Sequence, residues 1–167
     1  MPKSEEEIVA EAERVQEGIR HQLIELIILV LPDETLITEG QSDVMAAIPE
    51  EWVSEARLAQ PGAILIHNHP RGGPPSASDF NAAHQMGLLE MRVVGADFTW
   101  ICREAPGSRW WQMEQVVEEA EGTRAKLSLL SIVLSDGERG TAERAANRTH
   151  GILLLQQFPH LRRDPPP

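Results

Sequence analysis

Two histidines separated by one residue are the most informative feature of the sequence. His67 and His69 end a short apolar segment, and Ser76 and Asp79 follow His69 by seven and ten residues. In a strand, side chains at i and i+2 point to the same side, so both imidazoles can face one ion. Imidazole suits Zn²⁺, and Asp79 on the first turn of the next helix can be a third ligand. Three protein ligands leave a fourth position open, which is typical of catalytic zinc sites.

Each of these residues also has a purely structural explanation. His67 and His69 could be strand-end histidines packed in a core, and Ser-x-x-Asp is also the sequence of a helix-start capping box. The paired spacing, with Pro70 and Ser-x-x-Asp following it, favours metal binding. For Ser76 and Asp79, capping and metal binding are compatible: Ser76 can cap the helix while the carboxylate of Asp79 reaches the metal.

Hydrolysis at such a metal requires a general base, for which Glu25 is the candidate. Glu25 is the only charged residue in the segment 23–31, and a charge at the head of a core strand needs an explanation. If this strand neighbours residues 63–66, Glu25 lies beside the metal and can pass a proton from water to a leaving amine. Ser76 can donate a hydrogen bond to the oxyanion of the tetrahedral intermediate. A salt-bridged or solvent-facing strand end is the alternative for Glu25.

Taken together, these residues resemble the motif of the JAMM (MPN-type) metalloproteases: a glutamate, then His-x-His, a spacer and Ser-x-x-Asp. The sequence His-Asn-His-Pro and the Gly/Pro-rich loop that follows it are most similar to those of the RadC-like branch. In that branch the glutamate stands eight residues before an aspartate, as Glu25 stands before Asp33. One departure is that the spacer between His69 and Ser76 is one residue short. We expect the loop to be one residue shorter while the start of the following helix is unchanged. Any substrate contacts made by this loop would then differ from those of the family.

The resemblance covers roughly residues 20–104 and carries expectations about fold and function. It implies an α/β fold, the cytidine-deaminase-like (JAB/MPN) sandwich with a central mixed sheet flanked by helices. It implies one Zn²⁺ with His67, His69 and Asp79 as ligands, and Glu25 and Ser76 as catalytic residues. It also implies hydrolysis of peptide or isopeptide bonds, with a ubiquitin-like or sulfur-carrier-like protein conjugate as the substrate.

Two other functions are compatible with parts of this pattern. A non-catalytic module for protein interaction could keep the fold, but such modules usually lose ligands, and here the set is complete. A zinc deaminase acting on a nucleobase uses a Pro-Cys-x-x-Cys ligand pair. This chain has a single cysteine, Cys102, which argues against that class.

Hydrophobic periodicity and turn residues predict the elements that must position these groups. Ser4 and Glu7 form the pattern of a capping box before the first helix. Helices are predicted over residues 5–20, 49–60, 76–89, 115–121 and 141–157, and strands over residues 26–31, 35–38, 63–66, 92–94 and 98–102.

The chain continues well past the last of these strands. We expect a metalloprotease-like domain over residues 1–114 and a helical extension over 115–167 that ends in a frayed tail, Asp164 to Pro167. The extension carries two apolar clusters, residues 127–134 and 152–155. Clusters of this kind mark packing on the domain or contact with another chain, so a homo-oligomer is one expected assembly.

Composition excludes several classes of function. The formal net charge of −11 is unlike that of nucleic-acid binders or proteins of anionic membranes, which need basic patches. No apolar run approaches the ~20 residues of a membrane span. The acidic start of the chain does not look like a secretory signal. With one cysteine and no internal disulfide, we expect a cytoplasmic protein without nucleic-acid or membrane partners.

Overall fold

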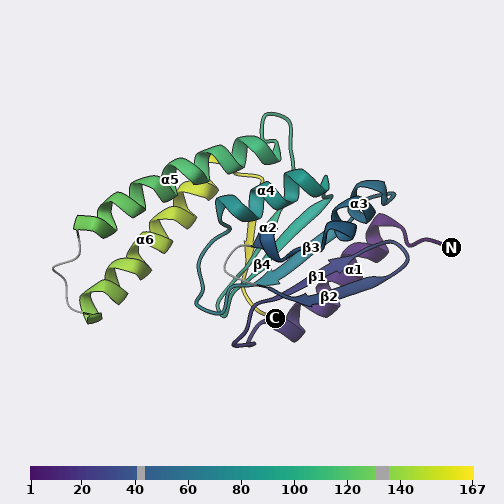
Figure 1. Ribbon diagram of the computed structural model, residues 1–167, viewed down its shortest axis with the longest axis horizontal. Helices are drawn as coiled ribbons and strands as arrows, with labels where there is room; N and C mark the ends of the chain where they lie inside the picture. Colours follow the sequence, from purple (N-terminus) through teal and green to yellow (C-terminus); the bar gives the residue numbers. More distant parts are fainter. Residues whose placement is uncertain (41–43, 131–135) are drawn as a thin grey trace.

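The fold is built around one mixed sheet. The computed structural model describes residues 1–40, 44–130 and 136–167, and of these the side chains of residues 124–130 and 136–143 are not described. The strand order is β2-β1-β3-β4-β5-β6 (Figure 1). β3 and β4 are parallel and each other neighbouring pair is antiparallel. The strands are β1 (Leu26–Val30), β2 (Thr35–Glu39), β3 (Ile64–Asn68), β4 (Glu90–Val94), β5 (Thr99–Cys102) and β6 (Arg162–Asp164).

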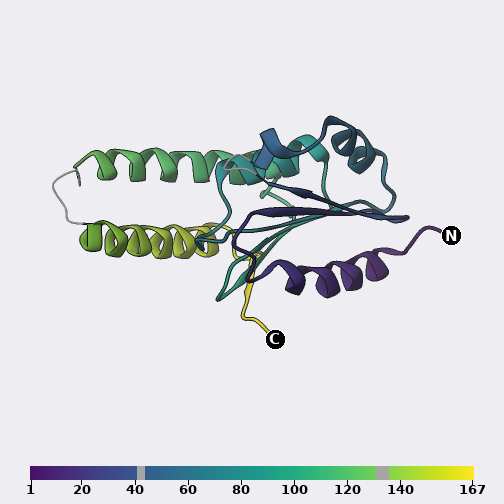
Figure 2. The same ribbon diagram turned by 60° about the horizontal axis from the view of Figure 1, so that its bottom comes forward.

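Helices cover both faces of this sheet. Figure 2 shows the first helix below the sheet and the second to fifth helices above it. The predicted mixed α/β architecture, with a central mixed sheet flanked by helices, is therefore confirmed. No helix in the described ranges has both the length and the apolarity needed to cross a membrane. The helices are α1 (Glu5–Gln16), a 3-10 turn η1 (Glu17–Ile19), α2 (Val44–Ala47), α3 (Glu50–Leu58), α4 (Ala77–Met86), α5 (Trp110–Leu130) and α6 (Asp136–Gln157).

Strand β1, between β2 and β3, is apolar throughout because both of its faces are covered. Ile27 and Leu29 belong to the core beneath α3, α4 and α5, whereas Ile28 and Val30 belong to a second core beneath α1. A strand covered on both faces does not alternate between apolar and polar residues. This explains why residues 26–31 form a continuous apolar run in the sequence.

Capping and two buried arginines fix α1 on its face of the sheet. The predicted capping box is present: Ser4 Oγ accepts from the Glu7 amide, and the Glu7 carboxylate accepts from the Ser4 amide. At the other end, the Arg20 guanidinium donates to the Gly95 carbonyl at 2.7 Å and to Thr99 Oγ1 at 2.9 Å. On β4, the buried Arg92 donates to Gln16 at 2.9 Å. These bonds tie the start of the chain to β4 and β5.

The C-terminal part of the chain is continuous with the core. The boundary expected at residue 114 falls inside α5, and α5 and α6 form an antiparallel hairpin that reaches past the sheet (Figures 1 and 2). Buried side chains from this part join the core above the sheet: Trp110, Met113, Val117, Leu154, Phe158 and Leu161. The packing expected for residues 152–155 therefore holds for Leu154, whereas the side chains of residues 127–130 and all of residues 131–134 lie outside what is described.

The end of the chain differs from the expected frayed tail. Residues Arg162–Asp164 form β6, which pairs antiparallel with β5 so that Asp164 lies opposite Thr99. The physical reason is that β5 would otherwise leave a row of backbone donors and acceptors open at the sheet edge. Only residues 165–167 follow the strand without regular structure.

We expect Leu154→Ala to lower the free energy of unfolding by about 2–5 kcal/mol, the usual cost of removing a buried leucine side chain. Leu154 is fully buried in the core above the sheet. Urea denaturation measures the effect, and Gln156→Ala, an exposed position on the same helix, is the matched control. Equal stability of both variants and the wild type would show that α6 does not belong to the cooperative core.

Candidate metal centre

The two histidines lie at the carboxyl end of β3. The strand extends beyond the predicted residue 66 and includes His67 and Asn68. His69 follows directly, and its amide donates to the Val94 carbonyl at 2.9 Å, which continues the pairing with β4. His67 is fully buried, whereas the His69 side chain is 19% exposed. The extended backbone directs both imidazoles toward the face beneath α4, as the i, i+2 spacing predicted.

Asp79 comes to the same place because of how α4 begins. Ser76 is the N-cap: its Oγ accepts from the Asp79 amide at 3.2 Å, and Asp79 Oδ2 accepts from the Ser76 amide at 2.6 Å. This reciprocal pair fixes the side chain of Asp79 on the first turn. The carboxylate also faces the two histidines. Asp79 can therefore take part in the helix cap and bind a metal at the same time.

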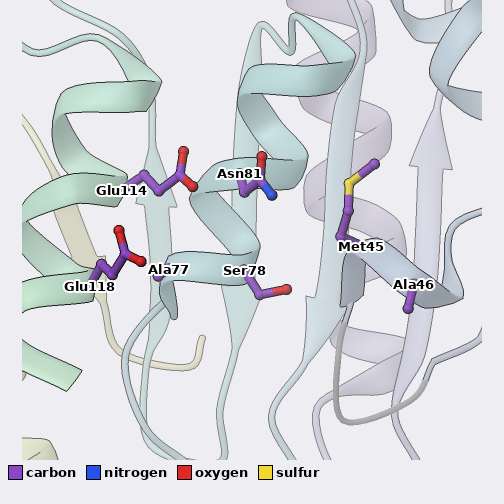
Figure 3. A pocket seen from close by; sticks show the side chains of 7 residues that line it. All are labelled: Met45, Ala46, Ala77, Ser78, Asn81, Glu114 and Glu118. Atoms are coloured by element: carbon purple, nitrogen blue, oxygen red, sulfur yellow. The ribbon is translucent and has the colours of Figure 1, made fainter. Parts of the chain in front are cut away.

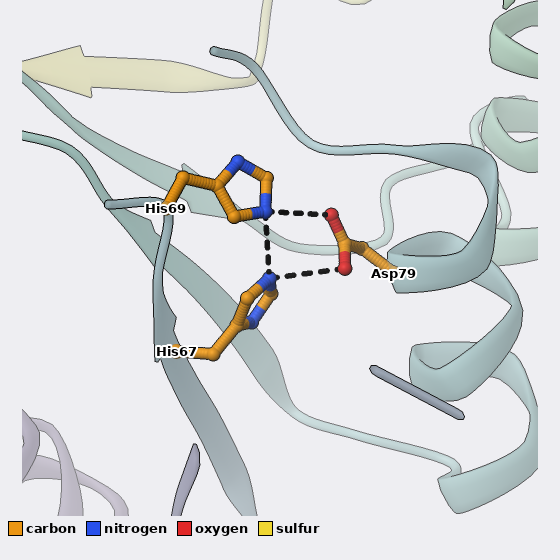
Figure 4. A group of neighbouring side chains, drawn as sticks. All are labelled: His67, His69 and Asp79. Atoms are coloured by element: carbon orange, nitrogen blue, oxygen red, sulfur yellow. Dashed lines mark hydrogen bonds and ion pairs between the residues drawn. The ribbon is translucent and has the colours of Figure 1, made fainter. Parts of the chain in front are cut away.

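The three ligand groups are close enough to bind one ion (Figure 4). His67 Nε2 lies 3.2 Å from His69 Nε2 and 3.0 Å from Asp79 Oδ1, and His69 Nε2 lies 3.5 Å from Asp79 Oδ2. Tetrahedral zinc with ligand bonds of ~2.0–2.1 Å separates its ligand atoms by about 3.3 Å. The distance between the two imidazole nitrogens is close to that value, and each of these nitrogens has one Asp79 oxygen at a similar distance, Oδ1 for His67 and Oδ2 for His69.

Two buried atoms of this cluster lack a hydrogen-bond partner among the described residues. They are His67 Nδ1 and Asp79 Oδ1. Asp79 Oδ1 is 3.0 Å from His67 Nε2, but the angles do not make a hydrogen bond. Buried polar atoms are nearly always satisfied, so an orphaned carboxylate oxygen beside the His67 imidazole fits an ion as the missing partner. A buried group of His67, His69 and Asp79 that could bind a metal ion is thus present.

Hydrogen bonding and charge set the protonation of the cluster. Burial raises the pKa of Asp79, but the adjacent imidazoles of His67 and His69 lower it by more, so its pKa lies well below the usual range. Burial lowers the pKa of His69, but its hydrogen bond to Asp79 and the charge of Asp79 raise it by more, so the net pKa lies above the usual value. Without metal, Asp79 is therefore ionised, and the His69 imidazole holds its proton more strongly than an ordinary histidine does.

The other nitrogen of His69 is directed by a loop carbonyl. His69 Nδ1 lies 3.3 Å from the Gly73 carbonyl oxygen. Only a protonated Nδ1 can donate to a carbonyl, so this contact leaves Nε2 with the lone pair that a metal requires. Gly73 has φ +110°, a conformation that favours glycine, which explains the Gly-rich sequence of this loop.

Glu25 immediately precedes β1 and lies beside the metal-binding cluster. β1 pairs with β3 so that Ile27 lies opposite His67, which puts Glu25, two residues earlier, on the same face. Burial raises the pKa of Glu25, the positive charges of His67 and His69 lower it, and the Asp79 charge raises it. The net pKa is above the usual value. The charges that act on Glu25 are those of the three candidate ligands, as expected for a group next to them.

Two residues that sequence reasoning missed hold Glu25 in place. Asn68 is fully buried on the opposite face of β3. Its Oδ1 accepts from the Leu26 amide at 2.6 Å, and its Nδ2 donates to the carbonyls of Gln22 and Ile24 at 3.2 and 2.9 Å. The residue between the two histidines therefore ties down the segment on either side of Glu25. A polar residue alternating with two histidines in an apolar strand is the signal that could have identified it.

Gly40, the second such residue, makes room for the Glu25 side chain. The Gly40 amide donates to the Glu25 carbonyl at 2.7 Å. A Cβ at position 40 would lie 2.8 Å from Glu25 Cγ, closer than real side chains approach. Glycine is thus required by packing on Glu25. Asp33, in contrast, is exposed in the turn at the other end of β1 and belongs to no part of the cluster.

A separate hollow of about 360 Å³ lies between α2, α4 and α5 (Figure 3). Glu114 and Glu118 reach into it from α5, opposite Ser78 and Asn81 of α4. None of the five predicted site residues lines it. Cys102 is buried in β5, and burial raises the pKa of its thiol, as suits a core residue rather than a nucleophile.

Comparison with known proteins identifies no relative of this chain. The chain matches no protein-family model, no curated protein and no solved structure. Any function must therefore be argued from the site itself.

We expect metal binding to release a proton near neutral pH, because the metal requires a neutral imidazole. The raised pKa of His69 keeps more of it protonated at about pH 7 than an ordinary histidine, so affinity should rise as the pH rises from ~6 to ~8. The lowered pKa of Asp79 means that the carboxylate contributes no proton. Calorimetric titration with Zn²⁺ in buffers of different ionisation enthalpy counts the protons. Affinity that is constant across this range, with no proton released, would contradict the assigned protonation.

Proposed function

We propose that the protein is a zinc-dependent hydrolase of peptide or isopeptide bonds, of the JAMM (MPN) type and closest to its RadC-like branch. The observation that carries the proposal is the convergence of His67, His69 and Asp79, whose ligand atoms all lie within 4.8 Å of one another. The proposal includes the cytidine-deaminase-like (JAB/MPN) form of the α/β fold and a cytoplasmic location.

The donor set favours zinc among the common metals. Two imidazoles and one carboxylate are ligands that zinc accepts in catalytic sites, with one position left open. When bound there, Zn²⁺ supplies Lewis-acid chemistry, polarising a carbonyl and lowering the pKa of a water molecule to about 7. The orphaned Asp79 Oδ1 and the Nδ1 contact of His69 with Gly73 support this use of the cluster.

Glu25 is suited to move the protons of the reaction. Its pKa lies above that of an ordinary glutamate because it is partly buried. A raised pKa brings a carboxyl group closer to neutral pH, where it can both accept and return a proton. In the proposed reaction Glu25 takes a proton from the attacking water and delivers it to the leaving amine.

Ser76 is suited to stabilise negative charge on the substrate. Its Oγ accepts the Asp79 amide hydrogen, and the hydroxyl hydrogen is left to donate. In the proposed reaction Ser76 donates to the oxyanion of the tetrahedral intermediate. The substrate class is a protein conjugate of a ubiquitin-like or sulfur-carrier-like modifier. The alternative, a non-catalytic interaction module of the same fold, is disfavoured because Glu25, Ser76 and all three ligands are retained together.

The metal assignment is tested by changing both histidines. We expect His67→Ala combined with His69→Ala to abolish the binding of one Zn²⁺ per chain, since one carboxylate cannot hold the ion by itself. The matched control is His21→Ala with His84→Ala, two exposed histidines. Elemental analysis after dialysis measures zinc content. Equal zinc in the double variant and the wild type would refute the assignment.

The catalytic assignment is tested at Glu25. We expect Glu25→Gln to retain zinc but to lose at least ~10²-fold in turnover, because the amide is nearly isosteric but cannot accept the proton. Turnover is measured on ubiquitin-like and sulfur-carrier-like proteins joined through their C-terminal carboxyl to a lysine side chain or a fluorogenic amine. Glu39→Gln is the control, since Glu39 pairs with Leu26 on the other face of the sheet. Near-normal turnover of the zinc-loaded Glu25 variant would reject the role. A wild type that binds zinc but cuts no conjugate would favour the interaction module.

A further inference from the structure

The C-terminal helix α6 lies against the loop that directs His69. The contact is made by the second half of the helix, which is anchored in the core by the fully buried Leu154. One turn earlier, Gly151 lies against the indole of Trp100 on β5. A Cβ at Gly151 would lie 3.0 Å from Trp100 Cζ2 and 3.2 Å from Cη2. Glycine in the middle of this helix thus allows α6 to approach the sheet closely.

Asn147 stands four residues before Gly151, on the same side of α6. Its carboxamide stands beside Gly73 in the loop after His69, at the place that a side chain at position 73 would face. A Cβ at Gly73 would be 3.5 Å from Asn147 Nδ2 and 3.8 Å from its Cγ. The helix face that packs on Trp100 therefore also faces the Gly-rich loop, where the absence of a side chain at Gly73 leaves room for Asn147.

Gly73 is the residue whose carbonyl oxygen lies 3.3 Å from His69 Nδ1. The two residues after it, Pro74 and Pro75, are buried, so this part of the loop is packed rather than free in solvent. A series of neighbouring groups thus leads from Trp100 through α6 and Gly73 to the imidazole of a candidate metal ligand.

We infer that α6 is a structural part of the metal site and that Asn147 is a positioning residue for His69. Because its carboxamide occupies the space beside Gly73, Asn147 limits how far this loop residue can move and so keeps in place the carbonyl that orients the imidazole with Nε2 toward the metal. Groups that hydrogen-bond a metal ligand, as the Gly73 carbonyl does here, typically change metal affinity by 10–100-fold when they are altered, and Asn147 acts through this carbonyl. The inference rests on the metal binding of the proposed function but not on hydrolysis.

The test is the affinity of the full-length protein for Co²⁺ and Zn²⁺, measured by competition with a chromophoric chelator. We expect Asn147→Ala to bind one metal per chain with about tenfold lower affinity. The visible absorption of the Co²⁺ form should change as well, because the geometry at His69 changes. The matched control is Gln156→Ala, an exposed carboxamide on the same helix, for which affinity and spectrum should equal those of the wild type.

A second variant, Gly151→Ala, tests the same series of contacts from the other side. Its methyl group would lie 3.0 Å from Trp100 Cζ2, so we expect α6 to shift by a few tenths of an ångström and metal affinity to fall. Wild-type affinity and Co²⁺ spectrum in folded Asn147→Ala would overturn the inference while leaving the metal site intact. A wild type that binds neither metal would refute the proposed function and the inference together. Metal binding without hydrolysis would refute only the hydrolase, because the affinity comparison needs no substrate.

Discussion

The interior of this protein has to accommodate a buried carboxylate. Asp79 has no exposed surface, yet its lowered pKa keeps it ionised at neutral pH. An isolated charge in a protein core is very costly, so its partners must be supplied by the fold. One oxygen is satisfied by the Ser76 amide at the start of α4, and the other is directed at the imidazole of His67. The placement of α4 over the end of β3 thus supplies partners to the buried charge and also packs the apolar face of the helix.

The parallel pairing of β3 and β4 creates the place where these groups meet. Parallel strands need a crossover connection, and here that connection contains α4. The helix starts close to the carboxyl end of β3, where the strand finishes in His67 and Asn68. On one face of that strand the histidine points to Asp79, and on the other Asn68 holds the segment around Glu25. One strand therefore links the candidate ligands to the candidate base.

The chain beyond α4 completes the same core rather than forming a separate unit. Trp110 donates from its indole nitrogen to the Leu88 carbonyl at 3.2 Å, so the start of α5 is anchored at the end of the α4 region. β6 closes the sheet beside β5, where the Arg163 guanidinium lies 4.2 Å from the ring centre of Phe98. These contacts bring α6 to the metal-site loop, which a domain ending at residue 114 would not have included.

Local rules were sufficient to predict several features from the sequence. The capping boxes at Ser4 and Ser76, the apolar run of β1, and the shared face of His67 and His69 depend on residues only a few positions apart. Local spacing and dihedral preferences determine such features, so they can be inferred without the fold. The resemblance further suggested Asp79 as third ligand, and the structure places it beside both histidines.

Contacts between distant parts of the chain could not be predicted in this way. The hydrogen bonds of Asn68 join residues more than forty positions apart, and the clash that requires Gly40 depends on the pairing of β1 with β2. The strand β6 forms because β5 offers an open edge, although its own sequence is charged and followed by prolines. Likewise, Asn147 comes to lie beside Gly73 because α6 folds back onto Trp100. The sequence alone thus determined the candidate ligands and the local elements that carry them, because those depend on spacing along the chain. Tertiary structure decided which distant residues support them, because packing and strand pairing act across the whole molecule.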